Sequence, residues 1–166
     1  LGAPSGYVVP LFDPVGAQQP ETCELIEDAG LIVIDDGPKM TTLVRSLRES
    51  PAMAAMVRAF EGGTAILGMG AGAAALGAWV AETDAKEVDV NRAEPGLGWL
   101  TNIIVASHFE GTEDAHRLRK LLNLKRNCLG IGIPEGVGLG LGPLSEVENV
   151  GSGQVTVVVS GLEVEA

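Results

Sequence analysis

The sequence predicts an α/β fold, in which helices flank a mainly parallel sheet and antiparallel strands extend it near the C-terminus. Strand-like and helix-like segments alternate through the front part of the chain, which is typical of a parallel sheet covered by helices. Two of the strand-like segments, Leu31 to Ile34 and Thr64 to Leu67, consist almost entirely of apolar residues, which suits strands buried on both faces. From Leu129 on, short strand-like segments are separated by glycine-rich turns, which predicts the antiparallel extension.

Length and composition predict a single domain, residues 1–166, without a nucleic-acid or membrane partner. Of the 166 residues 46% are hydrophobic, enough for one core, and the formal net charge of -11 repels nucleic acid and anionic lipid. No apolar run is long enough to span a membrane, and the first residues form no intact signal peptide, so a cytoplasmic location is favoured. Cys23 and Cys128 lack metal-ligand spacing and are predicted to be small buried hydrophobic residues. No cofactor is expected.

The first part of the chain predicts one further strand and three helices. The strand is expected from Tyr7 to Phe12, and a helix follows between Pro20 and Gly30. Helices are also expected from Thr41 to Leu47 and from Pro51 onward, where Ser50 is placed to cap the N-terminus. Four apolar residues at helical spacing in this last helix are expected to face the core: Met53, Met56, Val57 and Phe60.

The second part predicts two helices and a series of strands. Residues from Ala73 to Val80 are apolar nearly all round and predict a buried helix, followed by an acidic loop over 81–98. A strand is expected from Asn102 to Ala106 and an amphipathic helix from Asp114 to Leu124. The strands expected after it are Leu129 to Ile133, Gly136 to Leu141, Glu146 to Val150 and Gln154 to Val159.

A glycine-rich turn connects the apolar run ending at Leu67 directly to the next helix, with the sequence Gly68-Met69-Gly70-Ala71-Gly72-Ala73. Such glycines permit a tight turn with close helix–strand packing, and a helix N-terminus there could bind phosphate. The chain lacks both the Lys-Ser/Thr of a P-loop and the acidic residue of a dinucleotide site, so the dinucleotide interpretation is poorly supported. The same geometry is a nucleophile elbow, whose tip would be Gly70, a residue with no side chain to attack with.

This turn resembles that of cyanophycinases and the related dipeptidase E serine peptidases, which have Gly-Thr-Ser-Ala-Gly-Ala there. Upstream, Ala29 to Gly37 resembles the segment that ends in the family's Gly-Gly-Asp/Asn-Gln. Downstream, the family's Gly-Leu-Gly-Leu-Leu, Asp-Gln-His-Phe, Leu-Gly-Ile-Gly-Ile-Asp-Glu and Gly-Ser-Gly recur in order. In this chain they are similar to Gly96-Leu97-Gly98-Trp99-Leu100, Ala106-Ser107-His108-Phe109, Leu129 to Glu135, and Gly151-Ser152-Gly153.

The resemblance implies a class I glutamine amidotransferase-like fold, a flavodoxin-like three-layer arrangement, and a Ser-His-Glu hydrolase site. His108 matches the general base, and Glu135 matches the carboxylate that orients it. Gly70 stands at the position of the nucleophilic serine. The oxyanion hole that the family forms here would involve Ala71 and Asp36.

Several polar positions depart from the family's pattern. Asp35 and Asp36 stand where the family has Gly-Gly, and two carboxylates would oppose a developing oxyanion. Pro38 replaces Gln, and Pro134 replaces the Asp before the orienting carboxylate. The chain also begins after the strand–helix–strand portion with which the family starts. The sheet edge that this leaves exposed predicts assembly with another subunit.

Two functional hypotheses concern hydrolysis. The first is a protein without hydrolase activity that keeps the fold for a structural, assembly or binding role, as a homo-oligomer or with a peptide ligand. Losing a triad nucleophile costs roughly a million-fold in turnover, which favours this hypothesis. The alternative is an active peptidase for Asp-containing dipeptides or cyanophycin-like β-Asp-Arg substrates, with Ser107 or Cys128 as the other nucleophile. A different oxygen or sulfur in the place of the missing serine would argue against inactivity.

A third hypothesis is a cation site. Carboxylates and imidazoles are ligands for divalent metals, and four such residues follow predicted strands: Asp35, Asp36, His108 and Glu135. Solvent-exposed loop acids beside a leftover histidine are the favoured explanation of the same residues. No bound metal is therefore expected.

Overall fold

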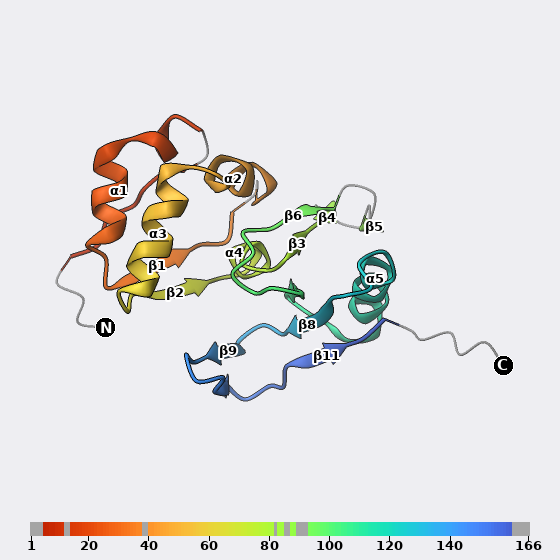
Figure 1. The fold of residues 1–166 in the computed structure, drawn as a ribbon. Coiled ribbons are helices and arrows are strands. Elements are labelled where there is room, and N and C mark those ends of the chain that lie inside the picture. Colours follow the sequence, from red (N-terminus) through yellow and green to blue (C-terminus); the bar gives the residue numbers. More distant parts are fainter. Residues whose placement is uncertain are drawn as a thin grey trace. The chain divides into compact units, whose positions relative to one another are not determined.

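The computed structural model describes residues 5–11, 14–37, 40–81, 83–84, 87–88 and 93–160. It confirms the α/β class, because helices and strands alternate as far as β3, helix α5 connects the parallel strands β7 and β8, and antiparallel strands follow (Figure 1). The chain divides into two compact units. The first contains Leu1–Val33 and Thr42–Leu67, and the second contains Ile34–Thr41 and Gly68–Ala166.

Two helices pack against each other in the first unit, α1 (Pro20–Glu27) and α3 (Pro51–Glu61). Both begin with a proline in the first turn, as the sequence predicts. Ser50 caps α3 as expected, and its hydroxyl accepts a hydrogen bond from the Met53 N–H at 3.1 Å. A short 3-10 turn (Gly16–Gln18) precedes α1, and the expected helix before α3 is α2 (Met40–Leu47).

The buried face of α3 differs from the expected stripe. Met56 is buried, but Val57 and Phe60 are 36% and 52% exposed. The buried positions on this helix are Ala52, Ala55, Met56 and Ala59. The buried positions of α3 are therefore mainly small residues, and the larger Val57 and Phe60 lie partly exposed.

Strands β1 (Leu31–Ile34) and β2 (Ala65–Gly68) pair with each other. The expectation of burial on both faces is wrong for them. Ile34 is buried, whereas Leu31, Val33 and Leu67 are each about half exposed. An apolar run therefore predicted the strands, but the number of covered faces depends on neighbouring elements that the run does not specify.

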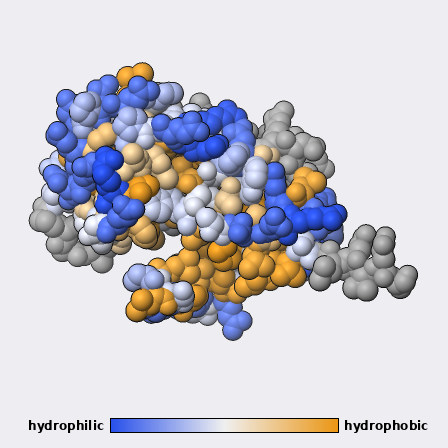
Figure 2. All heavy atoms as spheres, in the orientation of Figure 1, coloured by the Kyte–Doolittle hydropathy of each residue, from blue (hydrophilic) through white to orange (hydrophobic). Residues whose placement is uncertain are grey.

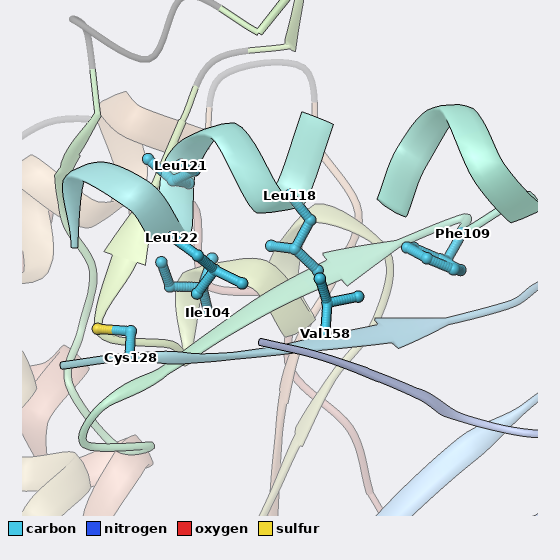
Figure 3. Close-up of a cluster of buried hydrophobic side chains, with 7 residues drawn as sticks. All are labelled: Ile104, Phe109, Leu118, Leu121, Leu122, Cys128 and Val158. Atoms are coloured by element: carbon cyan, nitrogen blue, oxygen red, sulfur yellow. The ribbon is translucent and has the colours of Figure 1, made fainter. Parts of the chain in front are cut away.

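The second unit is built on a three-stranded sheet in the order β11 (Thr156–Val158), β8 (Leu129–Ile133) and β7 (Ile103–Ser107). β8 is parallel to β7 and antiparallel to β11, which matches the predicted change from parallel to antiparallel pairing. Helix α5 (Gly111–Leu124) packs on one face of this sheet (Figure 3). The buried cluster between them consists of Ile104, Phe109, Leu118, Leu121, Leu122, Cys128 and Val158.

Two glycines of β8 allow this close packing. A Cβ on Gly130 would lie 2.7 Å from Leu118 Cδ2, and a Cβ on Gly132 would lie 2.7 Å from Phe109 Cε2. Both distances are shorter than carbon–carbon contacts, which are optimal near 3.5–4.0 Å. The alternation of glycine with apolar residues in this strand therefore sets the distance between the sheet and α5.

The remaining strands form two-stranded antiparallel pairs. These are β3 (Trp79–Val80) with β6 (Glu94–Pro95), β4 (Thr83–Asp84) with β5 (Glu87–Val88), and β9 (Gly138–Leu141) with β10 (Val147–Val150). Apolar side chains gather over the antiparallel strands of the second unit (Figure 2), and the exposed ones include Leu141, Val147 and Val157. Within the described ranges, no helix is long and apolar enough to cross a membrane.

Three expected elements are wrong. The helix expected from Ala73 to Val80 is limited to α4 (Ala71–Ala75), because the chain then turns and β3 pairs with β6. Part of the acidic loop expected over 81–98 forms strands, and the rest of that segment includes residues outside the described part. Residues 7–11 form no strand, and Phe12 lies outside the described residues.

Candidate functional site

The turn predicted as an elbow lies between the end of β2 at Gly68 and the start of α4 at Ala71. Gly70 precedes the helix with φ 52° and ψ -121°, a conformation that residues with a side chain rarely adopt. Its carbonyl oxygen accepts a hydrogen bond from the Ala73 N–H at 3.1 Å, which closes the first turn of the helix. A strained turn from strand to helix is the geometry of a nucleophile elbow.

The glycines on either side of Gly70 are required by close backbone contacts. A Cβ on Gly68 would lie 2.6 Å from the Ala73 Cα, and a Cβ on Gly72 would lie 2.7 Å from the Ile34 carbonyl carbon. The Met69 N–H also donates to the Ile34 oxygen at 2.9 Å, which ties the turn to the end of β1. The glycine pattern read from the sequence thus has a steric cause.

Asp36, two residues after β1 ends, fills the space next to the elbow tip. A Cβ on Gly70 would lie 2.6 Å from Oδ2 and 2.7 Å from Oδ1 of this aspartate. Oδ1 accepts a hydrogen bond from the Ala71 N–H at 2.8 Å. A carboxylate therefore occupies the direction in which a side chain at position 70 would extend. It also uses the backbone N–H that an oxyanion hole would offer at this turn.

His108 follows β7 directly and faces the same carboxylate. Its Nε2 lies 3.5 Å from Oδ2 of Asp36, and the side chains are 61% and 53% exposed. His108 also has a φ of 50°, a left-handed conformation that is uncommon outside glycine and is enriched at functional sites. The structure thus brings Gly70, Ala71, Asp36 and His108 together in the second unit.

Glu135 lies at the same end of the sheet, beyond β8. The register of the parallel pair places Ser107 opposite Ile133, and the Phe109 N–H donates to the Ile133 oxygen at 3.1 Å. Glu135 is exposed. Of the residues that the structure describes, Asp36 is the acid that forms an ion pair with His108, and no ion pair joins His108 to Glu135.

The alternative nucleophile Cys128 lies far from His108. It directly precedes β8, whose first residue Leu129 pairs with Ile103, so the same register places Cys128 beside Asn102. Asn102 lies six residues before His108, which corresponds to about 20 Å along a strand. Cys128 is buried in the cluster under α5, and its burial raises the pKa of the thiol above the usual 9.0, which Lys125 partly opposes. A buried thiol of this kind is unreactive.

The acidic residues do not form a metal centre. Among the described residues, no group of three or more histidine, cysteine, aspartate or glutamate side chains is arranged to hold a metal ion. The Asp35 side chain contacts the adjacent backbone, where its Oδ1 accepts a hydrogen bond from the Asp36 N–H at 2.8 Å. The four residues considered for a cation site are therefore not gathered into one.

Sequence reasoning missed the contact between Asp36 and the elbow tip. The sequence does contain a signal for it. A side chain is lost at Gly70, while one is gained at Asp36 relative to the pattern that the chain resembles. Two such changes are expected as a pair when one side chain takes the volume that the other leaves.

Comparisons with known proteins concern the family and the fold of the chain. The model of peptidase family S51 matches residues 12–141. The crystal structure of a peptidase from an acI-B1 Actinobacterium is similar, with a TM-score of 0.75 and 23% sequence identity, which shows the same fold. The match covers 93% of this chain and 66% of that one, so the chain spans less than two thirds of the length of that peptidase. No curated protein matches the chain.

Proposed function

This chain belongs to peptidase family S51, and from that premise we propose that it does not carry out serine-type peptide hydrolysis. Its fold then serves a structural, assembly or binding role. The observation that supports this proposal is the elbow tip, where Gly70 carries no hydroxyl and the Asp36 carboxylate fills the vacated space.

Two physical effects act against serine-type chemistry at this turn. Removing the nucleophile of a triad costs roughly a million-fold in turnover. The Ala71 N–H is already bonded to a negatively charged oxygen, so it is not available to an oxyanion that develops on a substrate. A carboxylate at that place also repels the developing charge.

The test compares wild type with Gly70→Ser and with the double variant Gly70→Ser/Asp36→Gly. Each protein is treated with a fluorophosphonate and assayed with Asp-containing dipeptides and cyanophycin. We expect no labelling of wild type, and none of Gly70→Ser because the new side chain meets the Asp36 carboxylate. The double variant opens that space and is expected to react.

Wild-type labelling of a serine near His108, Ser107 above all, would contradict the proposal. The matched control is Asp36→Gly alone, which opens the same space without providing a hydroxyl. Circular dichroism of all variants establishes that a lack of labelling comes from the site and not from unfolding.

The alternative of an active peptidase with a non-standard nucleophile is favoured by one observation. Oδ2 of Asp36 would lie 2.6 Å from a Cβ on Gly70 and lies 3.5 Å from Nε2 of His108, so the pair can hold a water molecule and activate it as the nucleophile. Turnover of Asp-containing dipeptides or β-Asp-Arg substrates by wild type, lost in Asp36→Asn, would support this alternative.

The assembly role is supported by apolar surface on an acidic protein. Leu141, Val147 and Val157 are 47%, 68% and 64% exposed, and exposed apolar patches mark sites of interaction between proteins. We therefore propose a second copy of the chain as the partner of this face. Sedimentation velocity is expected to give a dimer for wild type and a monomer for Val157→Glu, and a wild-type monomer would contradict a homo-oligomer.

A further inference from the structure

Three groups surround the Asp36 carboxylate. Oδ1 accepts the Ala71 N–H at 2.8 Å, Oδ2 lies 3.5 Å from Nε2 of His108, and Oδ2 would lie 2.6 Å from a Cβ on Gly70. One carboxylate oxygen therefore stands where an elbow presents its attacking atom, beside an imidazole. The other oxygen is held by a backbone N–H, as an oxyanion would be.

We propose that Asp36 is a carboxylate nucleophile which, with His108 as general base, hydrolyses an uncharged alkyl halide. Aspartate forms covalent intermediates in several enzyme classes, so the residue type is suited to the role. The side chain is 53% exposed, so a small reagent can reach it. This activity goes beyond the proposed function and does not rest on it, because it uses neither a serine nor a peptide substrate.

The chemistry of a carboxylate nucleophile selects the substrate class. Attack on an amide would give a mixed anhydride, from which the carboxylate leaves far more easily than the amine, so the reaction reverses. Attack on a saturated carbon that carries a halide gives a stable ester, and the halide leaves without needing a proton. Asp35 and the net charge of -11 disfavour anionic substrates at this site.

Two steps complete the reaction. In the first, Oδ2 of Asp36 forms a bond to the alkyl carbon, and the halide leaves with its electron pair. In the second, Nε2 of His108 takes a proton from water, whose oxygen attacks the Cγ of Asp36. The resulting negative charge on Oδ1 is stabilised by the Ala71 N–H. The Cγ–Oδ2 bond then breaks, and the alcohol leaves with Oδ2 and the proton from His108. The new carboxyl group loses the remaining water proton to solvent, which restores the Asp36 carboxylate.

The test uses the whole chain, n-butyl bromide and heavy-oxygen water. Each wild-type turnover leaves a water oxygen in the Asp36 carboxylate, so mass spectrometry of the peptide containing Asp36 is expected to show heavy oxygen. In His108→Asn, which tolerates the positive φ at this position, loss of the base slows ester hydrolysis by about a hundred-fold or more. The butyl ester of Asp36 is then expected to accumulate.

Asp36→Asn is expected to abolish both signals, whereas the matched control Asp35→Asn, whose carboxylate contacts the neighbouring backbone, retains both. Two results together would overturn the proposal: no heavy oxygen is found in Asp36 of the wild type, and no butyl ester forms on Asp36 of the His108→Asn protein. Butyl groups found only on other residues, such as Cys23, would overturn it equally. Equal ester lifetimes in wild type and His108→Asn would remove His108 as the base.

Discussion

The contact between Asp36 and Gly70 makes a quantitative prediction for the variant Gly70→Ala. Its new Cβ would lie 2.6 Å from Oδ2, so the carboxylate must move and lose its hydrogen bond to the Ala71 N–H. That bond to a charged group on a half-exposed side chain contributes about 1–1.5 kcal/mol. The positive φ of Gly70 adds about 1–2 kcal/mol of backbone strain for alanine. We therefore expect a loss of about 2–3.5 kcal/mol in the free energy of unfolding.

A double-mutant cycle separates the two contributions. Asp36→Ala alone loses the hydrogen bond, and Gly70→Ala in that background adds only the strain, because nothing is left to displace. The coupling energy between the two positions is therefore about 1–1.5 kcal/mol, measured by urea denaturation. Gly98→Ala is the matched control for strain, since Gly98 has a φ of 77° and no atom within 4 Å of its would-be Cβ. Additivity within about 0.5 kcal/mol would refute the proposed packing of Asp36 against the elbow.

Three further predictions follow from packing and burial. Gly72→Ala is expected to lower the free energy of unfolding by about 3 kcal/mol or more in urea denaturation, because its Cβ meets backbone that cannot rotate away. This loss should exceed that of Gly98→Ala. Leu122→Ala should cost about 2–5 kcal/mol because this side chain is 0% exposed, whereas Leu124→Ala, 57% exposed, should change the unfolding free energy little. Because burial raises the pKa of the Cys128 thiol above 9.0, the unfolded chain loses this proton first, so stability should fall more steeply as the pH rises past 9.0 in wild type than in Cys128→Ala.

Local sequence chemistry predicted most elements because helix starts and strand lengths depend on nearby residues. Ser50 and Pro51 marked the start of α3, and Leu129–Ile133 was placed as a strand with its observed bounds. Local patterns were wrong where a partner element decided the outcome. The apolar run from Ala73 to Val80 is divided because β3 pairs with β6, and α3 buries mainly alanines while Val57 and Phe60 are partly exposed.

The candidate site follows the same division. The sequence by itself determined the glycine turn, the absence of a hydroxyl at Gly70 and the position of His108 just after a strand, because each depends on residue type and local order. Only the tertiary structure decided that Asp36 fills the space at the elbow and faces His108, with Glu135 outside that pair. The physical reason is that a contact between the ends of separate strands depends on how those strands are arranged in space. No local pattern of residues encodes that arrangement.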